Sequence, residues 1–187
     1  MSSITSISIC NKALTYLSAE RINSLAENSE NARRCNAIYS YTRDELLASH
    51  TWKFATKFSN LAQLDETPIN GFTYAFALPA DFLKERELYY KYEFIISNSK
   101  LYTDDSSPTL EYIARVTDES KFPPYFAEAL SRRIASDLAF GITQNATLAQ
   151  SAFQIAEKVL REAKQTDSQG ATPKEPLRSR VLIDRMK

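Results

Sequence analysis

The sequence has few of the residues on which most catalytic and nucleotide-binding sites depend. Its 187 residues include one histidine, two cysteines and three glycines. General bases are most often histidines, and zinc sites usually need several His or Cys ligands. Phosphate loops and dinucleotide fingerprints need closely spaced glycines, whereas Gly71, Gly141 and Gly170 stand far apart. We therefore predict no catalytic residue, no metal site and no cofactor, and expect that the protein is not an enzyme.

The sequence also lacks long apolar runs. The longest are a few residues, far short of the ~20 that a membrane-spanning helix needs. The first eleven residues carry no Lys or Arg, so no signal peptide is indicated. Cys10 and Cys35 stand at apolar positions of helix-like patterns, which favours buried, reduced thiols. We expect a soluble protein that is made in a cytoplasm and has no membrane partner.

The sequence has no excess of either charge, with 23 basic and 23 acidic side chains. A protein that coats nucleic acid would normally be more basic. The distribution is uneven, because the segment from Thr172 onward has five basic and two acidic residues, a net charge of +3. Such a tail suits docking on an acidic surface. Its candidate docking residues are Arg178, Arg180, Val181, Leu182, Ile183 and Arg185.

Both ends of the remaining sequence show helical periodicity. Apolar residues spaced by three or four predict a first helix near residues 7–17 and a second near 30–49, for which Ser29 is a good N-cap. Pro123 and Pro124 are suited to the start of a third helix, which Gly141 is expected to end. A fourth helix is predicted near 146–166, with alanines along one side that allow close packing.

The middle of the sequence predicts strands instead. Aromatic residues alternate with polar ones in TWKFATKF and FTYAFALP, and SNSK marks a turn between later strands. The predicted fold is α+β: an antiparallel bundle of two N-terminal and two C-terminal helices, about 3–49 and 123–167, with one small antiparallel β-sheet inserted at about 50–118. We expect one domain over residues 1–170 and an extended C-terminal docking tail over 171–187.

Several polar features have alternative interpretations. The pairs Arg33-Arg34 and Arg132-Arg133 fit surface ion pairs with nearby carboxylates, or subunit contacts through bidentate binding. Asp104-Asp105 fits a solvated hairpin loop better than a metal site, because Ser-Ser-Pro follows it. His50 stands at an expected helix end, where a helix-terminal interaction or partial burial explains it. The run Tyr89-Tyr90-Lys91-Tyr92 fits an alternating strand better than a base-stacking surface.

The order of these segments resembles the head-to-tail adaptor family of short-tailed bacteriophages, of the tail tubular protein A type. The likeness covers most of residues 10–170 and depends on order and spacing rather than on one diagnostic motif. Four segments carry it: CNKALTYLSAERINSLAENSENARRCNAIYSYTRDELLASHTWKFATK, YAFALPADFLKERELYY, LEYIARVTDESKFPPYFAEALSRRIASDLAF and AEKVLREAKQTDSQ. The first contains the I-x-S-L connection and W-x-F strand, and the second contains the LP-x-D strand entry.

This resemblance implies a structural protein of the virion at the head–tail junction. Such adaptors form rings, usually of twelve copies, that join the portal protein to the tail nozzle protein. The ring continues the channel through which DNA leaves, without sequence-specific DNA binding. The tail after Gly170 matches no motif of the family, so its docking role is inferred from its charge and its apolar triplet.

Two other classes remain open at the level of sequence. A DNA-binding packaging or completion factor would present exposed basic residues and bind DNA in a salt-sensitive way. An enzyme such as a cell-wall hydrolase carried in the virion would use an Asp or Glu pair, but no pair in this sequence has a motif around it.

Overall fold

The computed structural model of the chain describes residues 3–88 and 92–169, and the predicted tail 171–187 lies outside them. The fold is α+β with four α-helices and two small antiparallel sheets, which confirms the predicted class. The helices are α1 (Ser6–Tyr16), α2 (Glu30–Ala48), α3 (Pro124–Thr143) and α4 (Ala146–Gln169), with short 3-10 turns η1 (Lys53–Ala55) and η2 (Glu119–Lys121). The strands are β1 (Thr56–Asn60), β2 (Ala62–Gln63), β3 (Tyr74–Ala77), β4 (Phe82–Leu88), β5 (Phe94–Ser97), β6 (Lys100–Thr103) and β7 (Thr109–Ala114).

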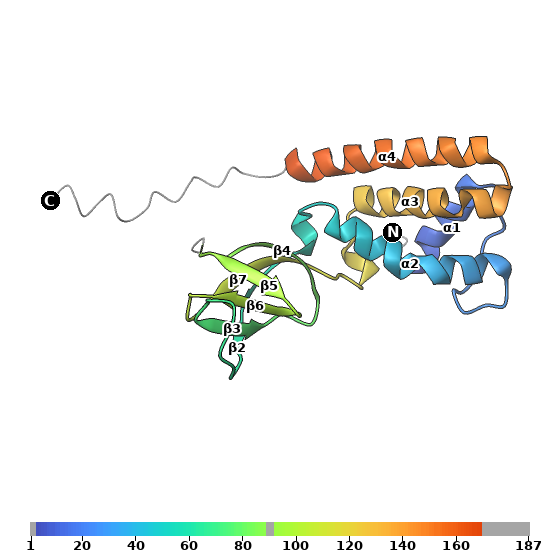
Figure 1. The fold of residues 1–187 in the computed structure, drawn as a ribbon. Helices are drawn as coiled ribbons and strands as arrows, with labels where there is room; N and C mark the ends of the chain where they lie inside the picture. The colour runs from blue at the N-terminus through green and yellow to red at the C-terminus, as the bar shows by residue number, and fades with distance from the viewer. Residues whose placement is uncertain (1–2, 89–91, 170–187) are drawn as a thin grey trace.

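Helix α3 is the centre of the helical half and packs against α1, α2 and α4 (Figure 1). Segments from both ends of the sequence therefore lie together, while the strands between them occupy one end of the molecule. Local signals start these helices. The Ser29 hydroxyl caps α2 by accepting from the Ala32 amide, Thr5 and Ser8 form a capping box on α1, and Pro124 opens α3.

The end of α3 differs from the prediction. The helix continues past Gly141 to Thr143 and ends at Gln144, which adopts a left-handed conformation with φ of 51°. Glycine adopts this left-handed conformation most readily, but a polar residue can also adopt it at the end of a helix. Gly141 lies inside the helix. Its carbonyl accepts a hydrogen bond from the Arg34 guanidinium of α2 at 3.0 Å.

The strands form two sheets where one was predicted. The first has the order β1-β7-β4 and the second β2-β3-β6-β5, with antiparallel pairing throughout. Leu61 separates β1 from β2, and its amide donates to the Pro108 carbonyl at 3.1 Å, which extends the β1–β7 register by one residue. Side chains from both sheets pack in one apolar core. That core contains Phe76, Leu88, Leu101, Leu110, Tyr112 and Ala114.

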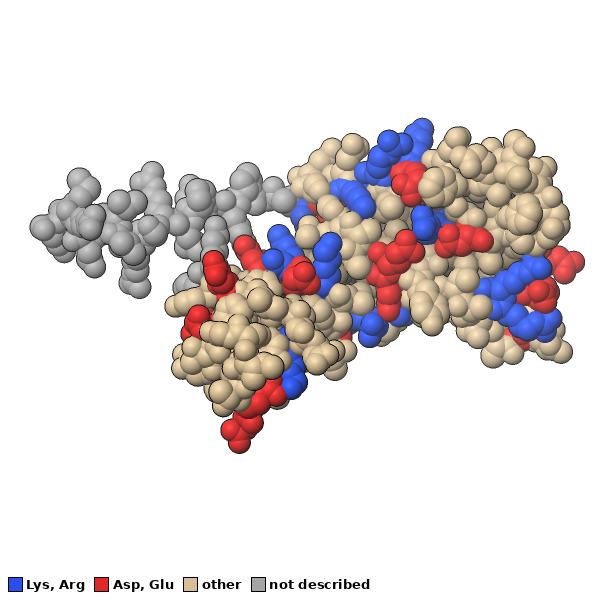
Figure 2. All heavy atoms as spheres, viewed as in Figure 1, with Lys and Arg blue, Asp and Glu red and all other residues tan. Residues whose placement is uncertain are grey.

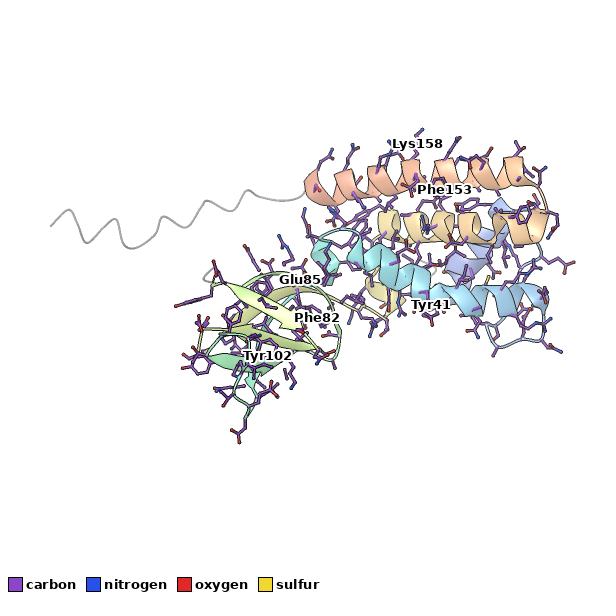
Figure 3. The ribbon with its side chains drawn as sticks, in the orientation of Figure 1. Tyr41, Phe82, Glu85, Tyr102, Phe153 and Lys158 are labelled. Carbon is purple, nitrogen blue, oxygen red and sulfur yellow. The ribbon has the colours of Figure 1, made fainter. Side chains whose placement is uncertain are left out.

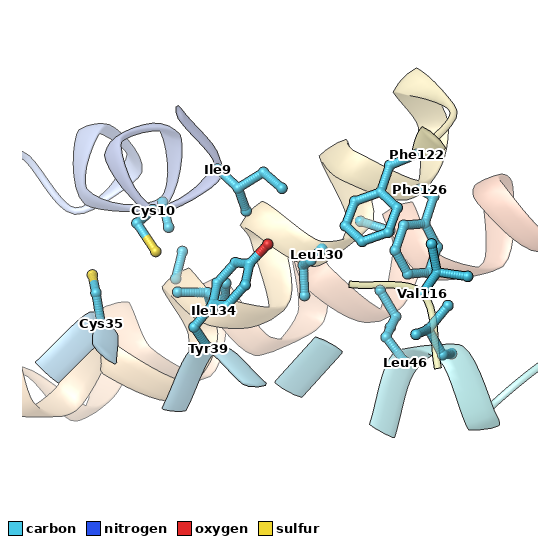
Figure 4. Close-up of a cluster of buried hydrophobic side chains, with 14 of the residues drawn as sticks. Ile9, Cys10, Cys35, Tyr39, Leu46, Val116, Phe122, Phe126, Leu130 and Ile134 are labelled. Atoms are coloured by element: carbon cyan, nitrogen blue, oxygen red, sulfur yellow. The ribbon is translucent and has the colours of Figure 1, made fainter. Parts of the chain in front are cut away.

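Trp52 was predicted in a strand, but it lies before η1 and is fully buried. Its indole N–H donates to the Leu46 carbonyl at 2.8 Å, and its ring meets Phe126 edge-on at 5.0 Å between centroids. A buried indole N–H needs a hydrogen-bond acceptor, and the Leu46 carbonyl at the end of α2 supplies one. This favours the buried position of Trp52 over a half-exposed strand face. The same core takes in Ile113 of β7, so it joins the sheets to the helices. Figure 4 shows Phe122 and Phe126 beside Val116 and Leu46.

Candidate subunit-contact surfaces

Arg33 and Arg34, predicted as possible subunit contacts, lie near the start of α2. Both form ion pairs with Glu30, at 2.9 Å from Arg33 and 3.1 Å from Arg34. Arg33 also donates to the Asn28 side chain at 2.7 Å. The Glu30 side chain accepts from both guanidinium groups, and the pKa of its carboxyl is lowered by the hydrogen bond with Arg33 and by the charges of both arginines. The Arg33 side chain is the more exposed of the pair.

Arg132 lies on α3, where this helix meets α1. Its guanidinium lies 3.4 Å from the centre of the Tyr16 ring and its Nε donates to Glu128 at 3.0 Å. Lys12 and the Tyr16 hydroxyl also contact Glu128. Burial would raise the pKa of the Glu128 carboxyl, but hydrogen bonds from Lys12, Tyr16 and Arg132 together lower it. The cluster therefore holds an ionised carboxylate between two cations.

Arg133 joins three helices. It pairs with Glu45 of α2 at 3.1 Å, with Asp137 of its own helix at 3.4 Å and with Glu157 of α4 at 3.4 Å. Burial raises the pKa of Asp137 in spite of the guanidinium beside it. Three carboxyl groups thus surround one guanidinium, and these contacts link α2, α3 and α4.

All four predicted arginines are used in contacts within the chain, as the surface ion-pair interpretation expects. Arg132 and Arg133 keep about a quarter of their side chains exposed, and Arg33 more than half. A further contact with a neighbouring subunit stays a prediction for these residues. The predicted docking residues of the tail lie outside the described residues: Arg178, Arg180, Val181, Leu182, Ile183 and Arg185.

The single histidine takes part in a buried polar cluster where α4 ends. Asp167 is 3% exposed, and its carboxylate accepts from the Tyr125 hydroxyl at 2.8 Å and from the Lys53 amide at 3.3 Å. His50 Nε2 lies 3.5 Å from the same carboxylate. Burial lowers the pKa of His50, although the charge of Asp167 opposes the shift. The cluster links the end of α4 to the segment before β1.

Other polar features have structural explanations within the described ranges, whereas Tyr89, Tyr90 and Lys91 of the predicted strand run lie outside them. Cys10 and Cys35 are buried and free, as predicted, and their sulfur atoms face each other in Figure 4. A hydrogen bond with Cys35 and burial raise the pKa of the Cys10 thiol. Asp104 accepts from the Thr73 amide and hydroxyl. Asp104 and Asp105 lie in a loop, as predicted, but the loop connects β6 of one sheet to β7 of the other and is not a hairpin. No group of metal-ligating side chains and no helix able to cross a lipid bilayer occurs among residues 3–88 and 92–169.

The surface exposes several large apolar side chains. Figure 3 shows two of them on the helical half, Tyr41 on α2 and Phe153 on α4. Helix α4 contributes most strongly, because it buries only three of its residues. Large side chains that are at least 45% exposed are Tyr41, Phe58, Ile69, Tyr92, Ile95, Phe140, Leu148, Phe153 and Ile155.

Two of these side chains line a groove between α1, α3 and α4. The groove encloses about 260 Å³ and contains Leu148 and Ile155 of α4, which face Leu17 at the end of α1. Leu148 is 53% exposed and Ile155 45% exposed. The rest of the lining is Tyr16, Ser18, Arg132, Ala135, Thr143, Ser151 and Ala152. The recess is therefore largely apolar, with three hydroxyl side chains of Ser and Thr and one arginine in its wall.

No protein-family model matches this sequence, and no curated protein matches it significantly. A function for this chain is therefore inferred from these surfaces and from the order of its segments.

Sequence reasoning missed the groove and the exposed Ile69, although both left a signal. Leu148 and Ile155 are seven residues apart and so share a helix face. That face borders the alanine side on which α4 was predicted to pack. Ile69 is the single large apolar residue between Asp65 and Gly71, in a segment predicted only as a polar loop.

Proposed function

We propose that this protein is a structural protein of the virion, a ring-forming adaptor between the portal and the tail nozzle of a short-tailed bacteriophage. The observation that carries the proposal is the arrangement of elements. The N-terminal helices α1 and α2 and the C-terminal helix α4 pack around α3, and the strands are inserted at one end. The resemblance implies this order of segments along the sequence.

The surface chemistry supports an assembly role. Exposed apolar side chains occur on the helices and on the sheets, and exposed apolar area is typical of surfaces that contact other proteins when it is contiguous. On the face in Figure 2, basic and acidic side chains alternate over the helical half without a continuous basic patch. A surface of this kind suits a channel protein past which DNA slides, because a continuous basic stripe would bind phosphates.

In this proposal the four helices form an antiparallel bundle that makes the body of the ring. The sheets and their loops face the nozzle or an adjacent subunit. The tail, 171–187, reaches the portal or the next subunit, with apolar anchors at Val181, Leu182 and Ile183 and cationic contacts at Arg178, Arg180 and Arg185. Ordering such a tail costs roughly 1–2 kcal/mol per residue in backbone entropy, and repeated copies around a ring offset this by avidity.

Electron microscopy tests the proposal directly. The full-length protein is imaged alone over a range of concentrations and after mixing with the portal protein of the same virus. We expect closed rings, either in the protein alone or seated on the portal. DNA binding is measured in parallel at low and high salt. A chain that stays monomeric with the portal, yet binds DNA tightly at low salt, would show that the packaging-factor alternative is correct.

A further inference from the structure

We propose that neighbouring copies join head to tail, with Ile69 of one copy seated in the groove between α1, α3 and α4 of the next. The inference deepens the proposed function and rests on it, because only an assembly supplies the second copy. The occupant of the groove is a second copy of this chain.

The groove is suited to an aliphatic side chain. Leu148, Ala152 and Ile155 provide its apolar wall, and its volume of about 260 Å³ exceeds the size of one such side chain. Scattered apolar residues on a surface are ordinary, but these lie together in one recess. Filling the recess would remove apolar surface from water on both partners.

The loop between β2 and β3 presents such a side chain. Ile69 is 103% exposed, which means that it has no cover from its own chain. The base of the loop is fixed: the Leu64 amide donates to the Ala75 carbonyl at 2.8 Å, and Thr73 donates twice to Asp104. Gly71 supplies a left-handed turn with φ of 90°. A loop held in this way loses less conformational entropy when it docks.

The charges of the two surfaces are complementary. Asp65, Glu66 and Asp104 lie in or beside the loop with one cation, Lys100, paired to Glu66. Acidic side chains are visible at the lower tip of the sheet half in Figure 2. At the groove, Arg132 lines the wall and Lys12 lies beside it, with Glu128 between them. An acidic loop therefore meets a cationic edge, which favours this orientation over its reverse.

The loop and the groove lie at opposite ends of the same molecule. Figure 1 places β2 and β3 at the sheet end, whereas the α3–α4 connection and the start of α4 lie at the other. One copy therefore cannot fill its own groove with Ile69. The contact uses two different surfaces, and contacts of this type close into rings when the rotation between copies permits. The arrangement thus gives a physical route from single chains to a ring.

Cross-linking between two populations of the full-length chain tests the contact. Asn70→Cys in one population leaves Ile69 in place, and Ser151→Cys in the other puts a thiol in the groove wall while keeping Leu148 and Ile155. Oxidised glutathione accepts the two electrons and two protons released when the disulfide forms. We expect the disulfide between Asn70→Cys and Ser151→Cys to form about tenfold faster than that between Asn70→Cys and Ser168→Cys, because docking raises the effective concentration of the first two thiols. Ser168 is an exposed serine at the far end of α4. The native thiols are buried.

Two variants show whether the apolar contact drives the reaction. Adding Ile69→Asp to the Asn70→Cys chain, or Leu148→Asp to the Ser151→Cys chain, is expected to reduce the rate to that of the Ser168→Cys control. Circular dichroism checks that each chain is folded. Equal rates for Ser151→Cys and Ser168→Cys, or no effect of Ile69→Asp, would overturn the proposal. If rings still form on the portal in that case, the adaptor function stands and only this contact is wrong.

Discussion

His50 is the residue that links the stability of this protein to pH near neutrality. Its ring meets Trp52 edge-on at 4.9 Å between centroids, and Nε2 lies 3.5 Å from the Asp167 carboxylate. Burial lowers the pKa of His50, the charges of Lys164 and Arg86 add to the shift, and Asp167 opposes it. In the sequence, His50 is notable only because it is the single histidine. Its partner is more than a hundred positions away, so no local pattern could identify Asp167.

The lowered pKa predicts how stability depends on pH. The folded state binds a proton on His50 less readily than the unfolded state, whose pKa is about 6.5. The contribution to the free energy of unfolding is therefore complete above pH 6.5 and is lost as pH falls toward the folded-state pKa. Urea unfolding at a series of pH values from about 7.5 to 5 measures this slope. We expect His50→Gln to flatten it, and Thr51→Gln, at the neighbouring exposed position, to leave it unchanged.

At the scale of elements, local patterns predicted the type of each segment better than its partners. Ser29 was correctly predicted as the cap of α2, and the alternating aromatics of FTYAFALP correctly indicated a strand. In TWKFATKF the same pattern was misleading for Trp52 and Phe54, which lie before and within η1. The division into two sheets was missed, because β1 pairs with β7 about fifty positions away. That pairing depends on the shared core beneath both sheets and not on alternation within either strand. The sequence likewise identified the arginine pairs as candidates. It could not identify Glu45 and Glu157 as partners of Arg133, because these residues lie on other helices.

Close packing of α4 on α3 gives a prediction at this scale. Ala156 is 3% exposed, on a helix that packs closely against α3. Ala156→Leu is expected to lower the free energy of unfolding by about 1–3 kcal/mol, because it forces the helices apart. Gln154→Leu introduces the same side chain at an exposed position and should change stability by less than about 0.5 kcal/mol. Chemical denaturation of both variants makes the comparison. Equal stabilities would show that α4 moves away from α3 easily.

For the whole molecule, the body and the tail are expected to serve different purposes. Two apolar cores are formed by residues within 3–88 and 92–169, and strand β7 contributes to both, with Ile113 in one and Tyr112 in the other. Deleting residues 171–187 should therefore leave the body folded while assembly on the portal is lost. Trp52, the single tryptophan, is fully buried in the core that joins helices and sheets, so its fluorescence reports the integrity of the body.

The deletion is compared with a full-length chain in which only the apolar triplet changes, Val181, Leu182 and Ile183 each to Ser. Both chains should show the unfolding transition of the unchanged protein by Trp52 fluorescence. Both should also fail to form rings on the portal in electron micrographs, if the triplet anchors the tail. Normal rings from the deleted chain would show that the tail is a passive extension. Normal rings from the serine chain alone would assign docking to Arg178, Arg180 and Arg185, whose charge that chain retains.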